Sequence, residues 1–452
     1  MKRTHDTALR PYVQLRLEQI READLLVGIP SCNHEQTIAH VIQRISGGLF
    51  EHYPAYRSVI LVSDAGSTDD TQDVAMLCPT LRWQEKLANA CRGTPGQASA
   101  FWAILEAAER LGVKACAVAV PDLWSNDSAW VKRLLDPVLE KGQDLVASVY
   151  PHGGCTHTEA NDVAYPLTRA LYGKRLRQPT GGDLAFAARL VRQYLACGFS
   201  KTDAAGLAPD LWMTTQALIS GASVCQAHVG GKRLRRKADA AFLADEFARV
   251  CGALFLLMEE HAAHWEAVRG SEPVLTFGEA EPEETEAPCI DLPWLAREFQ
   301  EGLRRFRPLW RASFSEDLWQ AVERLDEVPP STFHLPSSIW ARLLYELASV
   351  HRRAPTHGLR MLSAMAPLCL ARVASVCSQA AGLDATGLEA LVEENARAFE
   401  EHKDRLREQW SGDDFFGTST RVPFAAPGGP GGVPGQARVP SVDPRPTVVA
   451  GC

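Results

Sequence analysis

The chain has 452 residues, of which 46% are apolar and 23% are charged, and its formal net charge is −8. This composition is typical of a globular protein and excludes a disordered chain, and the length allows two domains. The acidic excess makes nucleic acid an unfavourable partner, because its phosphates are repelled.

The beginning of the chain and its cysteines bear on where the protein works. Met1-Lys2-Arg3 is basic, but no apolar stretch follows it, so we expect no signal peptide. No apolar run approaches the roughly 20 residues that cross a bilayer, so we expect no transmembrane segment. The 12 cysteines form no C-x-x-C pair, which favours a reducing compartment without disulfides. Together these features predict a cytoplasmic protein.

Short apolar strands alternate with helical stretches in the first half of the chain. Residues 1–23 have the pattern of a leading amphipathic helix. After it we expect strands at 25–29, 58–63, 115–120 and 144–149, and helices at 36–46, 70–77, 96–111 and 128–141. Such an alternation predicts an α/β fold with a largely parallel sheet and helices on both faces. Ligands of these sheets bind beyond the carboxyl ends of the strands.

The second half of the chain has a helical pattern, and we expect no strands beyond about residue 240. Helices are predicted at 241–266, 294–308, 315–325, 337–351, 358–380 and 386–410. This gives an α/β domain at 24–240 and a helical domain at 241–415, with an acidic linker near 279–288. Residues 423–452 are rich in Pro and Gly and poor in large apolar side chains, so we expect a disordered tail.

Two loops that follow predicted strands carry polar residues. The first, at 29–35, reads IPSCNHE, and the second, at 62–71, reads VSDAGSTDDT. A carboxylate that lies between a buried strand and the start of a helix could hold the ribose or base of a nucleotide. The N-terminus of the helix favours anions such as phosphate. The other interpretation is a capped loop, because Thr68 or Asp69 is a good N-cap in any protein.

Found together, the two loops resemble the nucleotide-binding half of family-2-like GT-A glycosyltransferases. Their pattern is P-x-x-N-x-E after one strand and S-D-x-G-S-T-D-x-T after the next. More narrowly, residues 165–173, 177–183 and 210–215 resemble the retaining branch that includes mannosylglycerate and glucosylglycerate synthases. This resemblance covers about residues 24–265 and implies a GT-A-type nucleotide-sugar-binding sheet.

The resemblance implies two groups of site residues. The nucleotide would be held by Pro30, Ser31, Glu35 and Asp64. The donor sugar and the acceptor would lie near Gly181, Gly182, Asp183 and Asp210, and the two carboxylates of this group would orient the reactants. Without the resemblance, a Gly-Gly-Asp turn either lets the backbone approach a ligand or is an ordinary tight turn.

Three positions depart from the pattern of these enzymes. An Asp-x-Asp usually holds a divalent cation, Mg²⁺ or Mn²⁺, on the diphosphate, but here Val120 takes its first position and only Asp122 remains. Leu234 stands where a metal-binding His is expected. Gln97 replaces the Lys of a P-G-K-G-like loop, though it stays a candidate contact to the nucleotide sugar. A cation on the leaving diphosphate is a main source of rate in such transfers, so its binding here is in question.

A basic run at 232–237 falls where the metal-binding His would otherwise lie. Lys232 and Arg233 begin it, and such side chains can hold phosphate oxygens directly. The alternative is a solvated basic loop, which is the usual role of a charge run.

Two functions remain open. One is a glycosyltransferase that moves a hexose from a nucleoside-diphosphate sugar to a small hydroxyl acceptor, with glycerate as one candidate, and with retention. The other is a catalytically impaired relative that binds a nucleotide sugar or a partner. The helical half would pack on the transferase domain, cover the acceptor side or form a homodimer.

Overall fold

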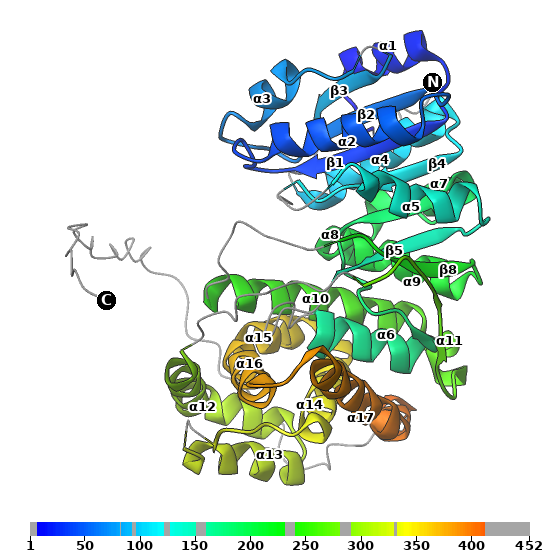
Figure 1. The fold of residues 1–452 in the computed structure, drawn as a ribbon. Helices are drawn as coiled ribbons and strands as arrows, with labels where there is room; N and C mark the ends of the chain where they lie inside the picture. The colour runs from blue at the N-terminus through cyan, green and yellow to red at the C-terminus, as the bar shows by residue number, and fades with distance from the viewer. Residues whose placement is uncertain are drawn as a thin grey trace, which may run out of the picture. The chain divides into compact units, whose positions relative to one another are not determined.

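Eight strands form one sheet in the order β10-β8-β5-β7-β4-β1-β2-β3 (Figure 1). The strands are β1 (Leu25–Ser31), β2 (Ser58–Asp64), β3 (Glu85–Ala90), β4 (Ala115–Val118), β5 (Leu145–Val149), β7 (Leu184–Ala187), β8 (Val224–His228) and β10 (Leu275–Phe277). All neighbours are parallel except β7, which runs antiparallel to both β4 and β5. The expected largely parallel sheet is confirmed.

The computed structural model describes residues 7–81, 83–92, 96–121, 127–150, 160–230, 240–280, 291–329 and 332–411. Within these ranges residues up to Ser411 belong to one compact unit. Most of the expected acidic linker and all of the expected tail at 423–452 lie outside the described residues. The division into domains at residue 240 stays a prediction.

Alternating side chains place two hydrophobic layers on the two faces of the sheet. On one face Val27 and Ile29 pack with α2 (Ile38–His52) and α5 (Ala129–Leu139). On the other face Leu26 packs with α4 (Gln97–Leu111) and α7 (Ala188–Ala196). Near its start the chain also forms α1 (Pro11–Ile20), and α3 (Thr71–Leu77) follows β2. The prediction of helices on both faces is therefore confirmed.

Several strands have no counterpart in the expected pattern. The edge strand β3 reads EKLANA, too polar to stand out, because an edge strand is only partly buried. The strand β10 comes from beyond residue 240 and pairs with β8, so the expectation that strands end there is wrong. A separate small sheet pairs β6 (Lys174–Arg175) with β9 (Glu272–Pro273).

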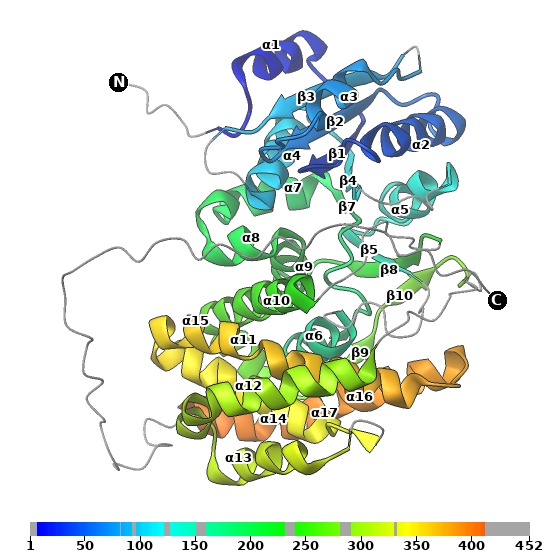
Figure 2. The same ribbon diagram turned by 90° about the vertical axis from the view of Figure 1, so that its left-hand side faces the viewer.

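The second half of the unit is helical, as expected. Its helices are α10 (Ala240–Glu260), α11 (Ala262–Ala267), α12 (Leu292–Ser313), α13 (Glu316–Glu323), α14 (Ser337–Arg353), α15 (Pro355–Ala364), α16 (Ala366–Ala380) and α17 (Ala385–Ser411) (Figure 2). Earlier helices α6 (Tyr165–Tyr172), α8 (Asp203–Leu207) and α9 (Pro209–Ile219) connect the sheet to them. Across the described ranges, no helix is both long and apolar enough to span a bilayer.

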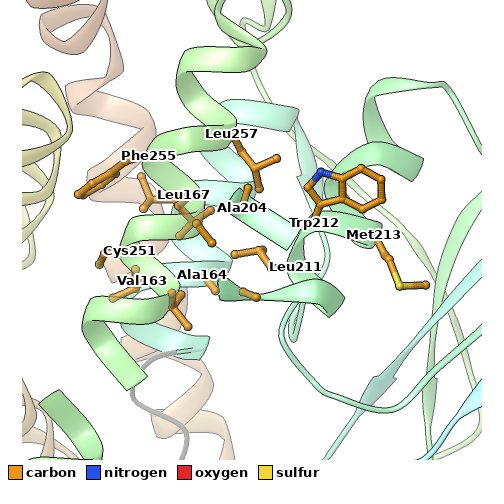
Figure 3. Packing of buried hydrophobic residues seen from close by; sticks show 14 of the residues in the cluster. Val163, Ala164, Leu167, Ala204, Leu211, Trp212, Met213, Cys251, Phe255 and Leu257 are labelled. Atoms are coloured by element: carbon orange, nitrogen blue, oxygen red, sulfur yellow. The ribbon is translucent and has the colours of Figure 1, made fainter. Parts of the chain in front are cut away.

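One hydrophobic core runs from the sheet into the helical half without a break. Figure 3 shows Leu167 of α6, Trp212 of α9 and Phe255 of α10 in this core. Cys251 is buried here with a free thiol. Cys377, by contrast, is disulfide-bonded, so the expectation of a chain without disulfides is wrong.

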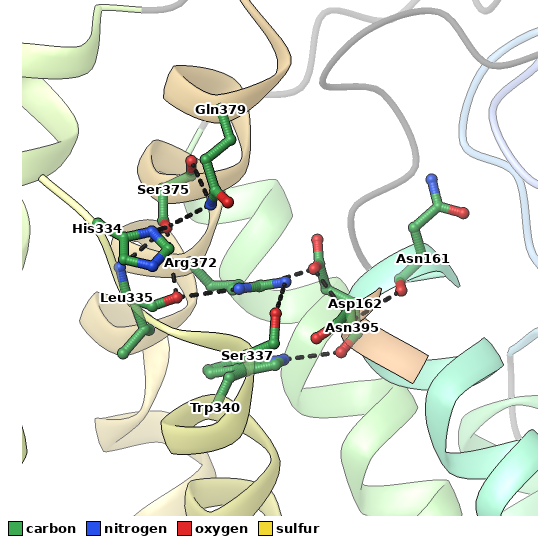
Figure 4. Close-up of polar contacts among 10 residues, drawn as sticks. All are labelled: Asn161, Asp162, His334, Leu335, Ser337, Trp340, Arg372, Ser375, Gln379 and Asn395. Carbon is green, nitrogen blue, oxygen red and sulfur yellow. Dashed lines mark hydrogen bonds and ion pairs between the residues drawn. The ribbon is translucent and has the colours of Figure 1, made fainter. Parts of the chain in front are cut away.

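A buried ion pair ties the segment before α6 to the helical half (Figure 4). Arg372 Nε of α16 donates to Asp162 Oδ1 at 2.8 Å, and both side chains are at most 6% exposed. Arg372 also donates to the Leu335 carbonyl at 3.0 Å, and the Trp340 indole donates to the Asp162 carbonyl at 2.7 Å. Burial raises the pKa of Asp162 above its ordinary value, while Arg372 opposes this shift. Each partner needs the other, because an unpaired buried charge is costly.

Candidate functional site

Ser31, Asp64 and the turn Gly181-Gly182-Asp183 lie at the same edge of the sheet. Ser31 ends β1 and lies opposite Asp64, which ends β2. The turn Gly181-Gly182-Asp183 comes directly before β7, and because β7 is antiparallel it starts where β4 and β5 end. Asp122, Lys232 and Arg233 follow the ends of β4 and β8 in the sequence and lie outside the described residues.

The same alternation puts the polar side chains at this edge on one face. Ile29, Val62 and Ala185, each two residues from a site residue, belong to the layer under α2 and α5. Side chains two apart in a strand share a face. Ser31, Asp64 and Asp183 therefore continue that hydrophobic layer as a polar border at the carboxyl ends of the strands.

Asp64 holds the turn that follows β2. Its Oδ2 atom accepts from the backbone N–H groups of Gly66 and Ser67 at 3.1 and 3.0 Å, and from Gln72 Nε2 at 2.7 Å. The Ser67 hydroxyl donates to Oδ1. The side chain is 2% exposed. The carboxylate thus shapes the loop, whereas the N-cap of α3 is Asp70 and not the expected Thr68 or Asp69.

The loops after β1 and β2 are joined side chain to backbone. Asn33, with a φ of 60°, accepts from Thr68 N at 2.8 Å, while its own N–H donates to Ser67 Oγ at 2.9 Å. Glu35 Oε2 accepts from Asp70 N at 3.1 Å, and Glu35 N donates to Asp69 Oδ2 at 3.2 Å. These reciprocal bonds explain why the two motifs occur together, because each loop supplies the partners of the other.

Ser31 and Ser148 are among the residues at this edge whose buried hydroxyls have no hydrogen-bond partner among the described residues. The Ser31 side chain is 2% exposed and the Ser148 side chain, near the end of β5, is fully buried. Pro30, beside Ser31, is half-buried. A buried hydroxyl without a partner is uncommon and calls for an explanation, such as a ligand.

The glycines of the turn are required by packing inside the protein. A Cβ at Gly181 would lie 2.7 Å from Ser148 Oγ, and one at Gly182 would lie 2.6 Å from Val120 Cγ2. Gly182 also has a φ of +82°, in the left-handed region that favours glycine. The turn therefore sits tightly against the ends of β4 and β5.

Asp183 is fully buried and its carboxylate is held by groups from three elements. Oδ1 accepts from Val120 N after β4 at 2.6 Å. Oδ2 accepts from the Trp130 indole of α5 at 3.2 Å and from the Tyr150 hydroxyl after β5. No motif in the sequence pointed to Trp130 or Tyr150. The geometry suits a side chain that positions the loops around it.

Asp210 lies in the first turn of α9. One helical turn later, the Thr214 hydroxyl donates to the Pro179 carbonyl at 3.3 Å, so this face of α9 borders the Gly-Gly-Asp loop. Burial raises the pKa of Asp210 above its ordinary value, and Arg249 of α10 opposes the shift. Gln97 is exposed at the first position of α4, directly after Gly96, which provides no side-chain cap.

The motif at 165–173 lies elsewhere, in the contact between α6 and α17. Arg169, only 4% exposed, donates to Glu393 at 2.7 Å and to Glu400 at 2.9 Å. The Tyr165 hydroxyl donates to Glu393 Oε1 at 2.6 Å. Arg177 of the second motif pairs with Glu389 at 3.2 Å. These residues bind the helical half to the sheet-bearing half.

In the described ranges, no group of three or more His, Cys, Asp and Glu side chains comes together. Val120 stands at the first position of the expected Asp-x-Asp, with its N–H bound by Asp183 and its side chain against Gly182.

No protein-family model matches the chain, and no curated protein matches it. Among solved structures, it is similar to glucosyl-3-phosphoglycerate synthase from Mycobacterium tuberculosis in complex with phosphoglyceric acid. The identity is 22% and the TM-score is 0.40, and the match covers 54% of this chain and 82% of that chain. A structure of that enzyme with Mn²⁺, uridine diphosphate and glucosyl-3-phosphoglycerate gives the same four values. Another, described as a mycobacterial protein, is 23% identical with a TM-score of 0.40, over 54% of this chain and 77% of that chain. Likenesses at this level assign no role to any residue.

Proposed function

We propose that the chain is a glycosyltransferase that moves a hexose from a nucleoside-diphosphate sugar to a small hydroxyl acceptor, with retention of configuration. Glycerate is one candidate acceptor. The observation that carries the proposal is the edge where Ser31, Asp64 and the Gly-Gly-Asp turn meet at the carboxyl ends of the strands. In open α/β sheets this edge is where ligands bind.

The unpartnered hydroxyls support a polar ligand at this edge. Ser31 and Ser148 are buried at the ends of β1 and β5, on either side of β4 and β7 in the strand order. A ribose or sugar hydroxyl would supply the hydrogen bonds that these two side chains lack. The α4 N-terminus, with Gln97 exposed, would add a partial positive charge near phosphate.

The two candidate catalytic carboxylates would differ in role. Asp183 is enclosed by Val120, Trp130 and Tyr150, so in this proposal it orients the turn and does not touch the sugar. Asp210 is half-buried and borders the same loop, which makes it the better candidate for a group that contacts the acceptor. Its raised pKa brings protonation closer to neutral pH.

No catalytic step is assigned to a metal. If Asp122 binds a cation, the substrate phosphates and water would have to supply the other ligands, as Mg²⁺ often permits. Lys232 and Arg233 are the alternative phosphate contacts in this proposal, and the two arrangements give opposite results with EDTA. A nucleotide-sugar-binding protein without transferase activity is the second candidate function, favoured by Val120 at the usual carboxylate position.

The deciding experiment supplies UDP-, GDP- and ADP-hexoses with glycerate as acceptor and measures the release of nucleoside diphosphate and the formation of a glycoside. The proposal expects acceptor-dependent turnover with at least one donor, and an α-linked product from an α-linked donor. Donor binding without turnover across a wider set of hydroxyl acceptors would favour the binding protein. An inverted product would contradict retention.

A further inference from the structure

The carboxylate of Asp64 is already occupied by donors from the protein itself. Its Oδ2 atom accepts from the N–H groups of Gly66 and Ser67 and from Gln72 Nε2, and its Oδ1 atom accepts from the Ser67 hydroxyl. An ionised carboxylate offers about four lone-pair positions, and each of these donors takes one. A ligand can therefore donate a hydrogen bond to Asp64 only after one of them has left.

Gln72 is the donor that can leave most easily. The N–H groups of Gly66 and Ser67 are part of the turn that follows Asp64, and the Ser67 hydroxyl is also held by Asn33 N at 2.9 Å. Gln72 instead reaches back to Asp64 from the first turn of α3, and it is half-buried. A change of side-chain rotamer exchanges the carboxylate for water and leaves the turn intact.

The orientation of the Gln72 amide follows from its partner. The amide has an acceptor oxygen and a donor NH₂ group, and a carboxylate is an acceptor only, so the NH₂ group must face Asp64. The Nε2–Oδ2 distance is 2.7 Å. Gln72 thus occupies with its own N–H the position that an N–H or O–H group of a ligand would take.

A hydroxyl without a described partner lies beside this carboxylate. Ser31 of β1 is opposite Asp64 of β2 in the register of the sheet, and the two side chains are on the same face. Both side chains are 2% exposed, but Asp64 has its hydrogen bonds and Ser31 Oγ has none among the described residues. A ligand that displaced Gln72 would bond to both side chains at once.

We propose that a nucleoside diphosphate displaces Gln72 from Asp64, which makes Gln72 a residue that sets the affinity of this site and selects its ligand. This inference rests on the proposed function. The ligand must bring a neutral N–H or O–H donor next to a group that bonds to Ser31. Ribose hydroxyls and the polar edge of a base both have this chemistry, whereas pyrophosphate has neither a ribose nor a base and leaves Gln72 in place.

Isothermal titration of the full chain with UDP, GDP, ADP and pyrophosphate tests the displacement. Gln72→Ala removes the internal donor, so its nucleotide affinity should rise about tenfold or more, the lower end of the range for a hydrogen bond to a charged group. Gln72→Met keeps the length of the side chain and should give a similar gain, because the gain comes from the freed carboxylate. The affinity for pyrophosphate should not rise in either variant.

Gln14→Ala is the matched control. Gln14 on α1 is also half-buried, and its Nε2 atom donates to the Leu9 carbonyl at 3.0 Å. The same chemical change there should leave nucleotide affinity as it is in the wild type. Titrations with the 2′-deoxy and 3′-deoxy nucleotides locate the ligand's donor: a gain that either form abolishes assigns it to the ribose, and a gain that both retain assigns it to the base. Both results support displacement.

Three outcomes would overturn the inference. Equal nucleotide affinity in the wild type and both Gln72 variants would do so and leave the proposed function standing. A gain in Gln72→Ala alone would also do so, because added space and not the freed carboxylate would be its cause. Absence of nucleotide binding in the wild type and in both variants would overturn the proposed function as well.

Discussion

The edge of the sheet and the contact between α6 and α17 both contain motifs that resemble glycosyltransferases, yet their polar groups are arranged differently. At α6, Arg169 is paired with Glu393 and Glu400, and Tyr165 donates to Glu393. At the sheet edge, Ser31 and Ser148 are buried without a partner among the described residues. A motif can therefore match in residues that hold the fold together as well as in residues that bind a ligand. Polar groups that are already paired inside the protein indicate the first role, and buried polar groups without a partner indicate the second.

The largest expected effect on stability comes from the buried ion pair between Asp162 and Arg372. Arg372→Ala removes the partner of buried Asp162, and breaking a buried ion pair in this way costs about 3–5 kcal/mol. Urea unfolding measures the loss. Arg307→Ala is the control, because its pair with Glu323 is on the surface, where less than about 1 kcal/mol is expected. Equal losses in the two variants would contradict the structural role given to the Asp162–Arg372 pair.

The comparison also predicts that the two regions are separable. If the contact between the halves only supports the fold, Arg372→Ala should leave nucleotide affinity at the sheet edge within about twofold of the wild type, under conditions where the variant is folded. A large loss of affinity would mean that the helical half shapes the edge as well.

A smaller effect is expected from the groups that position Asp183. Tyr150→Phe removes a hydrogen bond to a charged group, and the free energy of unfolding should fall by about 1.5–3 kcal/mol. Tyr194→Phe is the matched control, because its hydroxyl is also buried but has no partner within the described chain, so its removal should be nearly neutral. If both variants lose the same stability, the Asp183 network would not be what holds the turn.

The contact between α6 and α17 also predicts a pH dependence of stability. Lys403 is buried in the α6–α17 contact and donates to the carbonyls of Ala170 and Val268 at 2.6 and 2.8 Å. Burial, helped by Arg407 and Arg269 and opposed by Asp404 and Glu400, lowers the pKa of Lys403 to about 7.

The sign follows from proton binding. Between pH 7 and about 10 the unfolded chain holds a proton on Lys403 that the folded chain has lost, so this group makes stability rise with pH. Below pH 7 both states are protonated and the contribution is constant. Chemical denaturation of the wild type and Lys403→Met from pH 6 to 9 should show a slope that the variant lacks. Parallel curves would contradict the lowered pKa.

The sequence predicted the central strands, because β2, β4 and β5 are buried throughout and β1 is buried except at Pro30, so these strands are largely apolar. It did not predict the edge strand β3 or the three-residue β10, where partial burial and short length leave no pattern. The pattern of apolar residues in a sequence reflects burial, so it does not reveal strands at the margins of a sheet, which are only partly buried.

The sequence predicted those residues of the candidate site that lie in short motifs next to the strands. Ser31, Asp64 and the Gly-Gly-Asp turn follow or precede strands, and the structure brings them to one edge. Trp130 and Tyr150 were missed, because they reach Asp183 from 53 and 33 residues away. The pairing of Arg169 with Glu393 could not be predicted from the motif at 165–173, because the two residues are 224 positions apart in the sequence.

The central claim is that the Ser31 edge binds a nucleoside diphosphate, and isothermal titration with UDP, GDP and ADP, with Mn²⁺ and then with EDTA, tests it most directly. We expect one of these nucleotides to bind, and we expect Ser31→Ala to weaken its affinity by about threefold to tenfold, the range for one neutral hydrogen bond. Thr168→Val, which removes another buried hydroxyl without a described partner, on α6, should leave the affinity unchanged. Absence of binding under both conditions, or equal losses in the two variants, would contradict the account.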